Sequence, residues 1–150
     1  MEGLLIYPEE IFDTGDECTE EDKIYVLYNC CFGGFSISQG AMSLYNEKMK
    51  EKDPDFKEVI YDWDIDRSDP VLLDVFREMG SKRFSGRTAR VGIKSFDKKY
   101  RQFITYNEYD GKENVKIDYN RYHLYCITKT LLSNKSNDEK VETIMSFLDL

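Results

Sequence analysis

The chain has 150 residues, of which 41% are hydrophobic and 14% aromatic, enough for one compact domain and too few for two ordinary domains. No apolar run approaches the roughly 20 residues of a membrane helix, and the first residues are acidic where a secretory signal is basic. We therefore expect a protein of a reducing cytoplasm without membrane contact. The net charge of −8 argues against general nucleic-acid binding, because a negative body repels phosphate at long range.

Charge is distributed unevenly along the chain. Residues 1–22 contain nine acids and no base, and we expect them to form an acidic N-terminal arm. Residues 81–101 contain one acid and eight candidate binding residues: Lys82, Arg83, Arg87, Arg90, Lys94, Lys98, Lys99 and Arg101. These cations suit a phosphate or nucleic-acid surface, but they also suit neutralisation by the acidic arm of the same chain or of another copy. The second interpretation is favoured, and it predicts a homo-oligomer held by complementary charge.

The first predicted element is a buried strand at residues 23–29, where β-branched and aromatic side chains dominate. Gly33 and Gly34 then permit a sharp turn. Ser36 and Gln39 have the spacing of a helix capping box, and apolar side chains recur at helical spacing from there to about residue 52. The opening unit is therefore predicted to be a strand, a glycine turn and a helix.

The middle of the chain predicts a second strand and a second helix. Residues 56–66 alternate in a way that is typical of a strand with one apolar and one acidic face. Asp69 followed by Pro70 is a strong helix start, and Gly80 has the position of a C-terminal helix glycine. Arg67 precedes this helix, and we expect it to bridge neighbouring carboxylates and to hold the strand-to-helix turn in shape.

A β-hairpin is the clearest local prediction in the second half. Residues 89–96 predict a strand, and Asp110-Gly111 is the signature of a two-residue turn between strands at 101–109 and 112–118. Residues 120–132 are compatible with strand or helix, and Ser136 with Glu139 caps a last helix. We predict an α+β fold, a small mixed or antiparallel sheet with helices packed mainly on one face, plus a C-terminal helix. The expected organisation is an arm at 1–22, one domain at 23–132 and a helical extension at 133–150.

The glycine turn and the cysteines do not match an established catalytic pattern. The turn lacks the lysine of a nucleotide-binding loop and the spacing of a dinucleotide-binding loop, which leaves only generic anion binding open. Cys30 and Cys31 lack the arginine of a cysteine phosphatase. We expect them to be buried thiols, and a cysteine nucleophile with His123 as its base is the less favoured alternative.

The acidic series Asp62, Asp64 and Asp66 does not predict a metal site. On one face of a strand these side chains lie about 6–7 Å apart, so their oxygens do not converge on a cation. The four cysteines have no paired short spacing, and the chain has one histidine, which disfavours a zinc site. We therefore predict a non-enzymatic protein without catalytic residues, metal or cofactor.

Three motifs occur in order along the chain: Asn29-Cys-Cys-Phe-Gly-Gly-Phe-Ser-Ile-Ser38, Arg67-Ser-Asp-Pro70 and Asn107-Glu-Tyr-Asp-Gly111. Together they resemble the motifs of a family of short proteins from tailed bacteriophages and from large DNA viruses of amoebae, including marseilleviruses. The resemblance covers about residues 23–118 and implies no activity. It implies that the motif residues determine the fold: Gly33, Gly34, Ser36, Arg67, Asp69, Pro70, Asp110 and Gly111.

The same resemblance implies a viral protein that occupies the host cytoplasm and the virion. Combined with the charge pattern, it predicts a virion-associated, host-interaction or self-assembly protein that acts through contacts with a viral or host protein. The alternative function is binding of a nucleic acid or phosphate ligand through residues 81–101.

Overall fold

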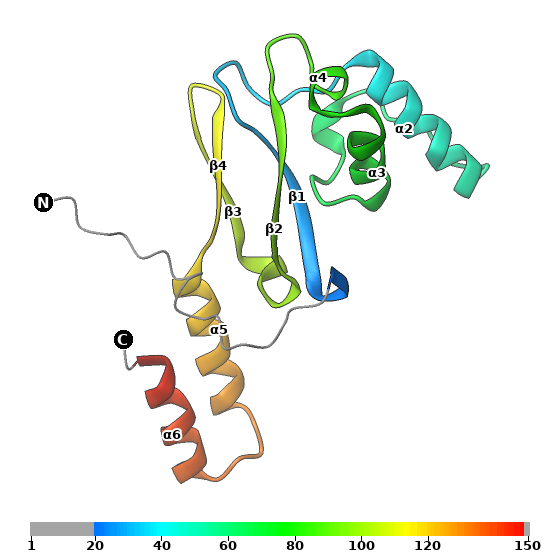
Figure 1. Cartoon of the computed structure of the whole chain (residues 1–150). Helices are drawn as coiled ribbons and strands as arrows, with labels where there is room; N and C mark the ends of the chain where they lie inside the picture. Colours follow the sequence, from blue (N-terminus) through cyan, green and yellow to red (C-terminus); the bar gives the residue numbers. More distant parts are fainter. Residues whose placement is uncertain (1–19, 149–150) are drawn as a thin grey trace, which may run out of the picture.

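The computed structural model describes residues 20–148, and it confirms the α+β class. In chain order the elements are η1 (Glu20–Asp22), β1 (Lys23–Asn29), α2 (Gln39–Lys52), η2 (Asp62–Asp64), α3 (Pro70–Met79), α4 (Ser81–Phe84), β2 (Val91–Asp97), η3 (Lys98–Phe103), β3 (Ile104–Tyr109), β4 (Lys112–Ile117), α5 (Tyr119–Leu131) and α6 (Asn137–Leu148), where η denotes a 3₁₀ helix (Figure 1). Within this range no helix combines the length and the hydrophobicity needed to cross a bilayer. The predicted arm at 1–22 lies outside the described residues except for η1.

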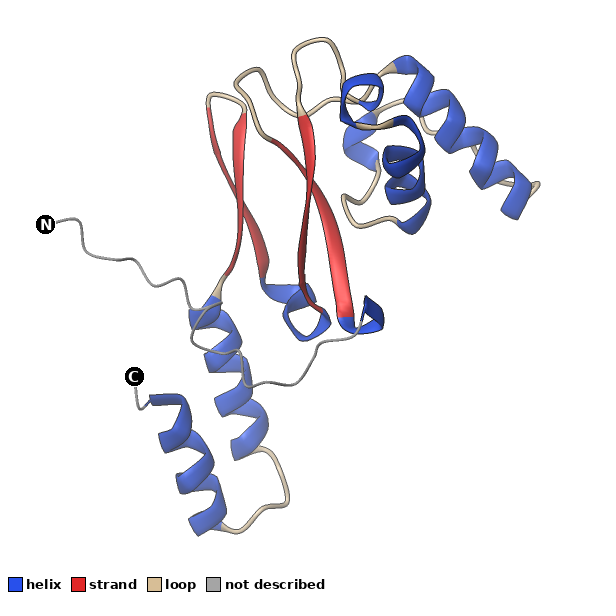
Figure 2. Cartoon of the chain, in the orientation of Figure 1, coloured by secondary structure: helices blue, strands red, loops and turns tan. Residues whose placement is uncertain are grey.

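Two antiparallel ribbons and a group of helices form three layers (Figure 2). The β1–β2 ribbon lies in the middle, and its two faces belong to different cores. Leu27 and Val91 pack with α2, α3 and α4, whereas Val26 and Phe96 pack with η3 and the β3–β4 ribbon. This division follows the two-residue period of a strand. The described strands therefore form two ribbons, with the first group of helices on one face of the central ribbon.

The start and end of α3 are as predicted. The carboxylate of Asp69 accepts the N–H groups of Val71 and Leu72 at 2.8 and 3.1 Å, and Pro70 occupies the first helical turn. Gly80 ends the helix with φ at 77°, a conformation that favours glycine. Local signals in neighbouring residues are sufficient to define this helix.

The start of α2 differs from the prediction. Its N-cap is Ser38, whose Oγ accepts the N–H of Ala41 at 3.1 Å, so the predicted capping box at Ser36 is wrong. The Ser36 carbonyl accepts the N–H of Gly86 at 2.9 Å, and Ile37 forms an antiparallel bridge with the segment before β2. The chain therefore stays extended through Ser36 because a distant segment pairs with it.

Residues 56–66 do not form the predicted strand. The buried side chain of Asn46 on α2 donates to the Val59 carbonyl at 3.0 Å and accepts the Val59 N–H at 2.9 Å. A side-chain amide thus takes the place of a neighbouring strand, and the segment continues into the single turn η2. The alternating pattern of side chains is present, but no strand lies beside it in the described structure.

The ambiguous residues 120–132 are helical, and they form a hairpin with the last helix. Asp118 caps α5 by accepting the N–H of Arg121 at 3.1 Å. Ser136 and Glu139 form the predicted capping box of α6, with bonds of 3.0 and 3.3 Å. α5 and α6 lie side by side, beyond the η3 end of the ribbons (Figure 1).

Candidate functional site

The three sequence motifs meet at one end of the central ribbon. Asn29, the last residue of β1, is fully buried. Its amide nitrogen donates to the carbonyls of Cys31 and Gly111 at 2.6 and 2.7 Å, and its amide oxygen accepts the N–H of Arg90 at 2.9 Å. One side chain therefore joins the glycine loop, the hairpin turn and the start of β2. We call this region the motif junction.

The predicted hairpin turn forms the outer part of the motif junction. Asp110 and Gly111 have φ values of 50° and 84°, the positive pair that is typical of a type I′ turn. The turn rests on the glycine loop, since the Gly33 N–H donates to the Asp110 carbonyl at 3.2 Å. A Cβ on Gly111 would overlap the backbone nitrogen of Gly34. These glycines let two backbones approach each other and leave no space for a ligand between them.

Arg67 contributes to the motif junction through a partner that the sequence did not indicate. Its guanidinium forms two hydrogen bonds with Glu113 on β4, 46 residues away, and the predicted pairing with neighbouring carboxylates is wrong. The guanidinium carbon lies 3.3 Å from the centre of the Phe35 ring. Nearby, the Tyr106 hydroxyl donates to the Leu27 carbonyl at 3.3 Å, and burial raises the pKa of Tyr106 to about 12. These contacts hold the layers together.

The basic segment does not form one patch. Its cations are Lys82, Arg83, Arg87, Arg90, Lys94, Lys98, Lys99 and Arg101. The first two lie on α4, the next two in the loop before β2, and the last three in η3. These groups are separated by the length of β2, about 20 Å. Lys94 lies between them and donates to the Val115 carbonyl at 3.0 Å. The structure therefore divides the segment into two cationic groups at opposite ends of one strand.

Cys30 and Cys31 lie far from His123, the only histidine of the chain. Cys30 and Cys31 are half-buried, not buried as predicted, and the Cys31 thiol donates to the Thr88 carbonyl at 3.4 Å. His123 lies on α5, at the other end of the central ribbon, with its ring 6.0 Å from that of Phe147 (Figure 1). The described geometry does not bring the Cys30 or Cys31 thiol within reach of the His123 imidazole.

Two members of the acidic series, Asp62 and Asp66, accept hydrogen bonds from nearby protein groups. Asp62 accepts the N–H of Ile37 at 3.2 Å. Asp66 accepts the hydroxyl and the N–H of Ser68 at 2.6 and 2.7 Å, and these hydrogen bonds lower the pKa of Asp66. Among residues 20–148 no three His, Cys, Asp or Glu side chains are grouped as metal ligands would be.

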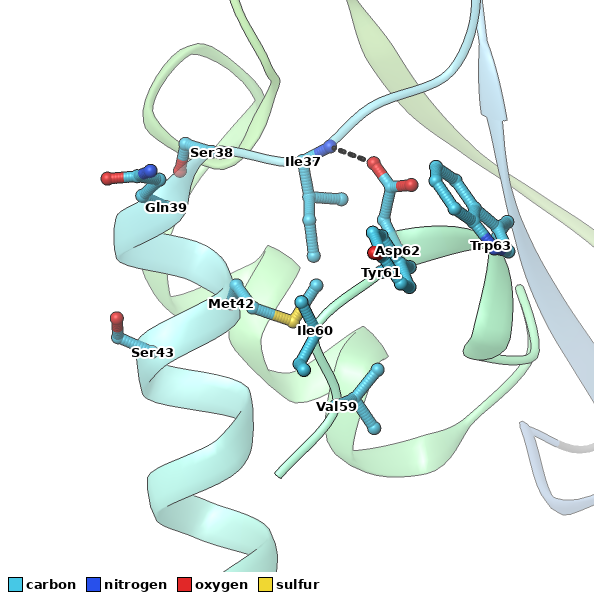
Figure 3. Close-up of a pocket in the computed structure, with 10 residues that line it drawn as sticks. All are labelled: Ile37, Ser38, Gln39, Met42, Ser43, Val59, Ile60, Tyr61, Asp62 and Trp63. Carbon is cyan, nitrogen blue, oxygen red and sulfur yellow. Dashed lines mark hydrogen bonds between the residues drawn. The ribbon is translucent and has the colours of Figure 1, made fainter. Parts of the chain in front are cut away.

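A groove of about 400 Å³ lies between the first half of α2 and residues 59–63 (Figure 3). Met42 and Ile60 approach each other across it, and the Asp62 bond to Ile37 closes one end (Figure 3). Its lining combines apolar and aromatic side chains with hydroxyl, amide and carboxylate groups: Ile37, Ser38, Gln39, Met42, Ser43, Val59, Ile60, Tyr61, Asp62 and Trp63. This mixture is typical of a site that takes an apolar side chain and orients it with polar contacts.

Two aromatic rings form the outer edge of the groove. Tyr61 and Trp63 stack with ring centres 4.5 Å apart and an angle of 9° between the planes. Trp63 is 73% exposed, Ile60 78% and Tyr61 51%. Adjacent large apolar side chains on a surface mark a contact site, and Trp and Tyr are the residues that most often dominate the energy of protein interfaces. We call Ile60, Tyr61 and Trp63 the aromatic edge.

The surroundings of the groove are acidic. Residues 53–66, which include the aromatic edge, contain six acids and one lysine. Asp64 is exposed between Trp63 and the buried Ile65. A ligand that covers the aromatic edge therefore approaches a negative surface, which favours a cationic partner.

The aromatic edge is not expected from the sequence. The strand pattern predicted for residues 56–66 has Tyr61, Trp63, Val59 and Ile65 together on its apolar face, whereas only Ile65 of these four is buried. The available signal was the tryptophan between two aspartates, a composition that suits a surface better than a core. Searches against protein-family models, curated proteins and solved structures gave no match.

Proposed function

We propose that this protein is a non-enzymatic binding module that holds an extended segment of a partner protein in the groove between α2 and residues 59–63. The observation that carries the proposal is the exposed Tyr61–Trp63 stack beside a groove of mixed apolar and polar lining. A stacked, rigid aromatic pair offers a large contact area at a small cost in side-chain entropy.

The chemistry of the groove defines the segment that fits. Met42, Val59 and Ile60 suit one apolar anchor side chain. The acids of residues 53–66 suit a lysine or arginine next to that anchor. The partner segment is therefore an apolar residue flanked by basic residues. The resemblance to phage and amoebal-virus proteins adds a proposed setting, in which the partner is a viral or host protein in the host cytoplasm or the virion.

Trp63 is the single tryptophan of the chain, so its fluorescence reports directly on the groove. The experiment selects displayed peptides on the full chain and titrates them into the parent chain by tryptophan fluorescence. The variants are compared by the fluorescence anisotropy of a labelled peptide, because Trp63→Ala removes the intrinsic fluorophore. We expect enrichment of sequences with an apolar anchor beside Lys or Arg. Binding should be lost in Trp63→Ala and weakened in Asp64→Lys. The matched control is Tyr109→Ala, because Tyr109 is 80% exposed but lies at the hairpin turn.

Two results would contradict this proposal. The first is a selection without enrichment, or with enriched peptides that bind Trp63→Ala as well as the parent chain. The second is tight binding of duplex DNA with an affinity that falls steeply as salt rises, which would support the alternative function of residues 81–101. In that case Arg87→Ala with Arg90→Ala, and not Trp63→Ala, would weaken binding.

A further inference from the structure

The α5–α6 hairpin has almost no core of its own. α6 contains no buried residue, and the only buried residue of α5 is Thr130. The two helices touch through the His123 and Phe147 rings and through a bond of 3.0 Å from Lys140 Nζ to the Leu131 carbonyl. Helices of 12 to 13 residues are marginal in water unless an apolar face is packed. The hairpin therefore has apolar surface that remains to be covered.

That apolar surface is one continuous face. On α5 it consists of Leu124 and Leu131, which are 64% and 55% exposed, and on α6 of Val141, Met145 and Leu148, at 60%, 50% and 57%. Each set follows helical spacing. Viewed along each helix from its N-terminus, the exposed residues are displaced in the same rotational direction from the residue that contacts the other helix. That residue is His123 on α5 and Phe147 on α6. In an antiparallel pair, stripes rotated in the same sense lie on the same side. We call these five residues the hairpin face.

The hairpin face points away from the rest of the part of the chain that the structure describes. The opposite side of α5 carries Tyr122 and Tyr125, whose rings lie 5.5 and 5.4 Å from that of Phe103 in η3. Tyr122 also contacts Tyr100, at 4.8 Å between ring centres. The body thus covers one side of α5 and leaves the hairpin face open to another molecule.

We infer that the hairpin face binds the hairpin face of a second copy of this chain, which forms an antiparallel four-helix bundle. The charges on the two helices favour a second copy of the chain as the partner of the hairpin face. By helical spacing, Arg121 on α5 and Asp138 and Glu142 on α6 border the hairpin face. Lys129 lies on the side of Tyr125, with its Nζ over that ring. A two-fold axis parallel to the helices stacks each α5 on the partner's α6, which pairs opposite charges. A two-fold axis perpendicular to the helices would stack like on like.

The size of the face sets the strength of the association. A helix of 13 residues is about 20 Å long, and a stable protein interface usually buries about 800 Å² on each partner. Two short helices offer less than that, so the dimer should be concentration-dependent and not permanent. This inference is independent of the groove, which lies at the other end of the central ribbon.

Sedimentation velocity of the full chain over a concentration series tests the inference. We expect a monomer–dimer equilibrium. Leu131→Gln with Met145→Gln should raise its dissociation constant by at least about tenfold, while circular dichroism shows that the helices remain. The matched control is Ile60→Gln, an even more exposed apolar residue outside the hairpin, which should leave the equilibrium unchanged. A chain that stays monomeric, or a dimer unaffected by the double substitution, would overturn the inference.

The effect of reversing one charge on the strength of the dimer tests how the helices are stacked and which segment joins the two copies. Arg121→Glu should weaken the dimer, and Glu142→Lys in the same chain should restore it, because α5 then again opposes a helix of opposite charge. A stronger dimer in Arg121→Glu would show that α5 stacks on α5. Deletion of residues 1–19 should leave the dimer intact. Loss of the dimer in that deletion would show that the acidic segment, and not the hairpin face, joins the copies.

Discussion

Arg67 and Glu113 meet in a two-pronged ion pair, with 3.0 Å from Nη1 to Oε1 and 3.2 Å from Nη2 to Oε2. The Glu113 side chain is only 8% exposed, and its Oε1 also accepts the N–H of Asn29 at 2.7 Å. The pair therefore connects the loop before α3, the end of β1 and the strand β4. Removal of the Glu113 charge leaves the half-buried guanidinium of Arg67 without its counter-charge.

Glu113→Gln should lower the free energy of unfolding by about 2–3 kcal/mol, since it keeps the shape of the side chain but leaves Arg67 without its counter-charge. Urea unfolding followed by circular dichroism measures the change. The matched control is Glu58→Gln, which removes the exposed pair with Lys50 and should cost less than about 0.5 kcal/mol. Equal effects of the two substitutions would show that the buried pair does not connect the layers as described.

Gly111→Ala should destabilise the protein more than Gly80→Ala. Both glycines have positive φ, 84° and 77°, so both substitutions carry a backbone cost of about 1 kcal/mol. A Cβ at Gly80 meets open space, whereas one at Gly111 overlaps the nitrogen of Gly34. The loss of stability in Gly111→Ala should exceed that in Gly80→Ala by about 2 kcal/mol, because the turn must move away from the glycine loop. Thermal unfolding of both variants measures it, and equal losses would argue against this close approach.

The alkaline pH dependence of stability should carry a contribution from Tyr106. Burial raises the pKa of Tyr106 to about 12, above the value near 10 of an unfolded chain. The folded protein therefore retains the proton that the unfolded chain releases. The stability from this group is complete below about pH 10 and is lost as the pH rises toward 12.

Tyr106→Phe should consequently be less stable than the parent at pH 8, where it lacks the bond to the Leu27 carbonyl, by about 1 kcal/mol. The difference should shrink or reverse between pH 10 and pH 11. Urea midpoints at each pH measure both effects. Parallel curves for the two proteins would contradict the raised pKa of the Tyr106 hydroxyl.

Asn46→Ala should open the groove. Two hydrogen bonds of 3.0 and 2.9 Å hold Val59 against the buried Asn46, and their loss should cost about 2 kcal/mol. Hydrogen exchange at the Val59 amide should accelerate, and the Trp63 emission should shift. Asn107→Ala is the matched control, because Asn107 is exposed. Unchanged exchange at Val59 would mean that Asn46 does not hold this wall of the groove.

The elements that sequence reasoning predicted well depend on adjacent residues. Asp110-Gly111 and Asp69-Pro70 contain their complete signals within two positions, and the structure confirms both. Ser136 and Glu139 are three positions apart and form the predicted box. In each case the hydrogen bonds that define the element are made within the element itself.

The missed features depend on contacts across the fold. Ser36 has the capping-box spacing with Gln39, but the distant bridge at Ile37 keeps the chain extended there and leaves Ser38 as the cap. The segment 56–66 has a strand pattern, but the Asn46 side chain occupies the place of a neighbouring strand. Trp63 between two aspartates indicated an exposed side chain, but the groove beside it depends on the Asn46 contact and has no local signal.

The separation of the groove from the hairpin face has a consequence for binding strength. The two surfaces lie at opposite ends of the central ribbon, so occupation of one leaves the other accessible. A dimer joined through α5 and α6 presents two grooves, and a partner that repeats its segment can engage both. The second engagement then occurs at a high effective concentration, which can strengthen overall binding by about 10²–10⁴ without any new contact. Even if each groove and the dimer interface bind weakly, the overall affinity would therefore rise steeply with the density of the repeated partner segment.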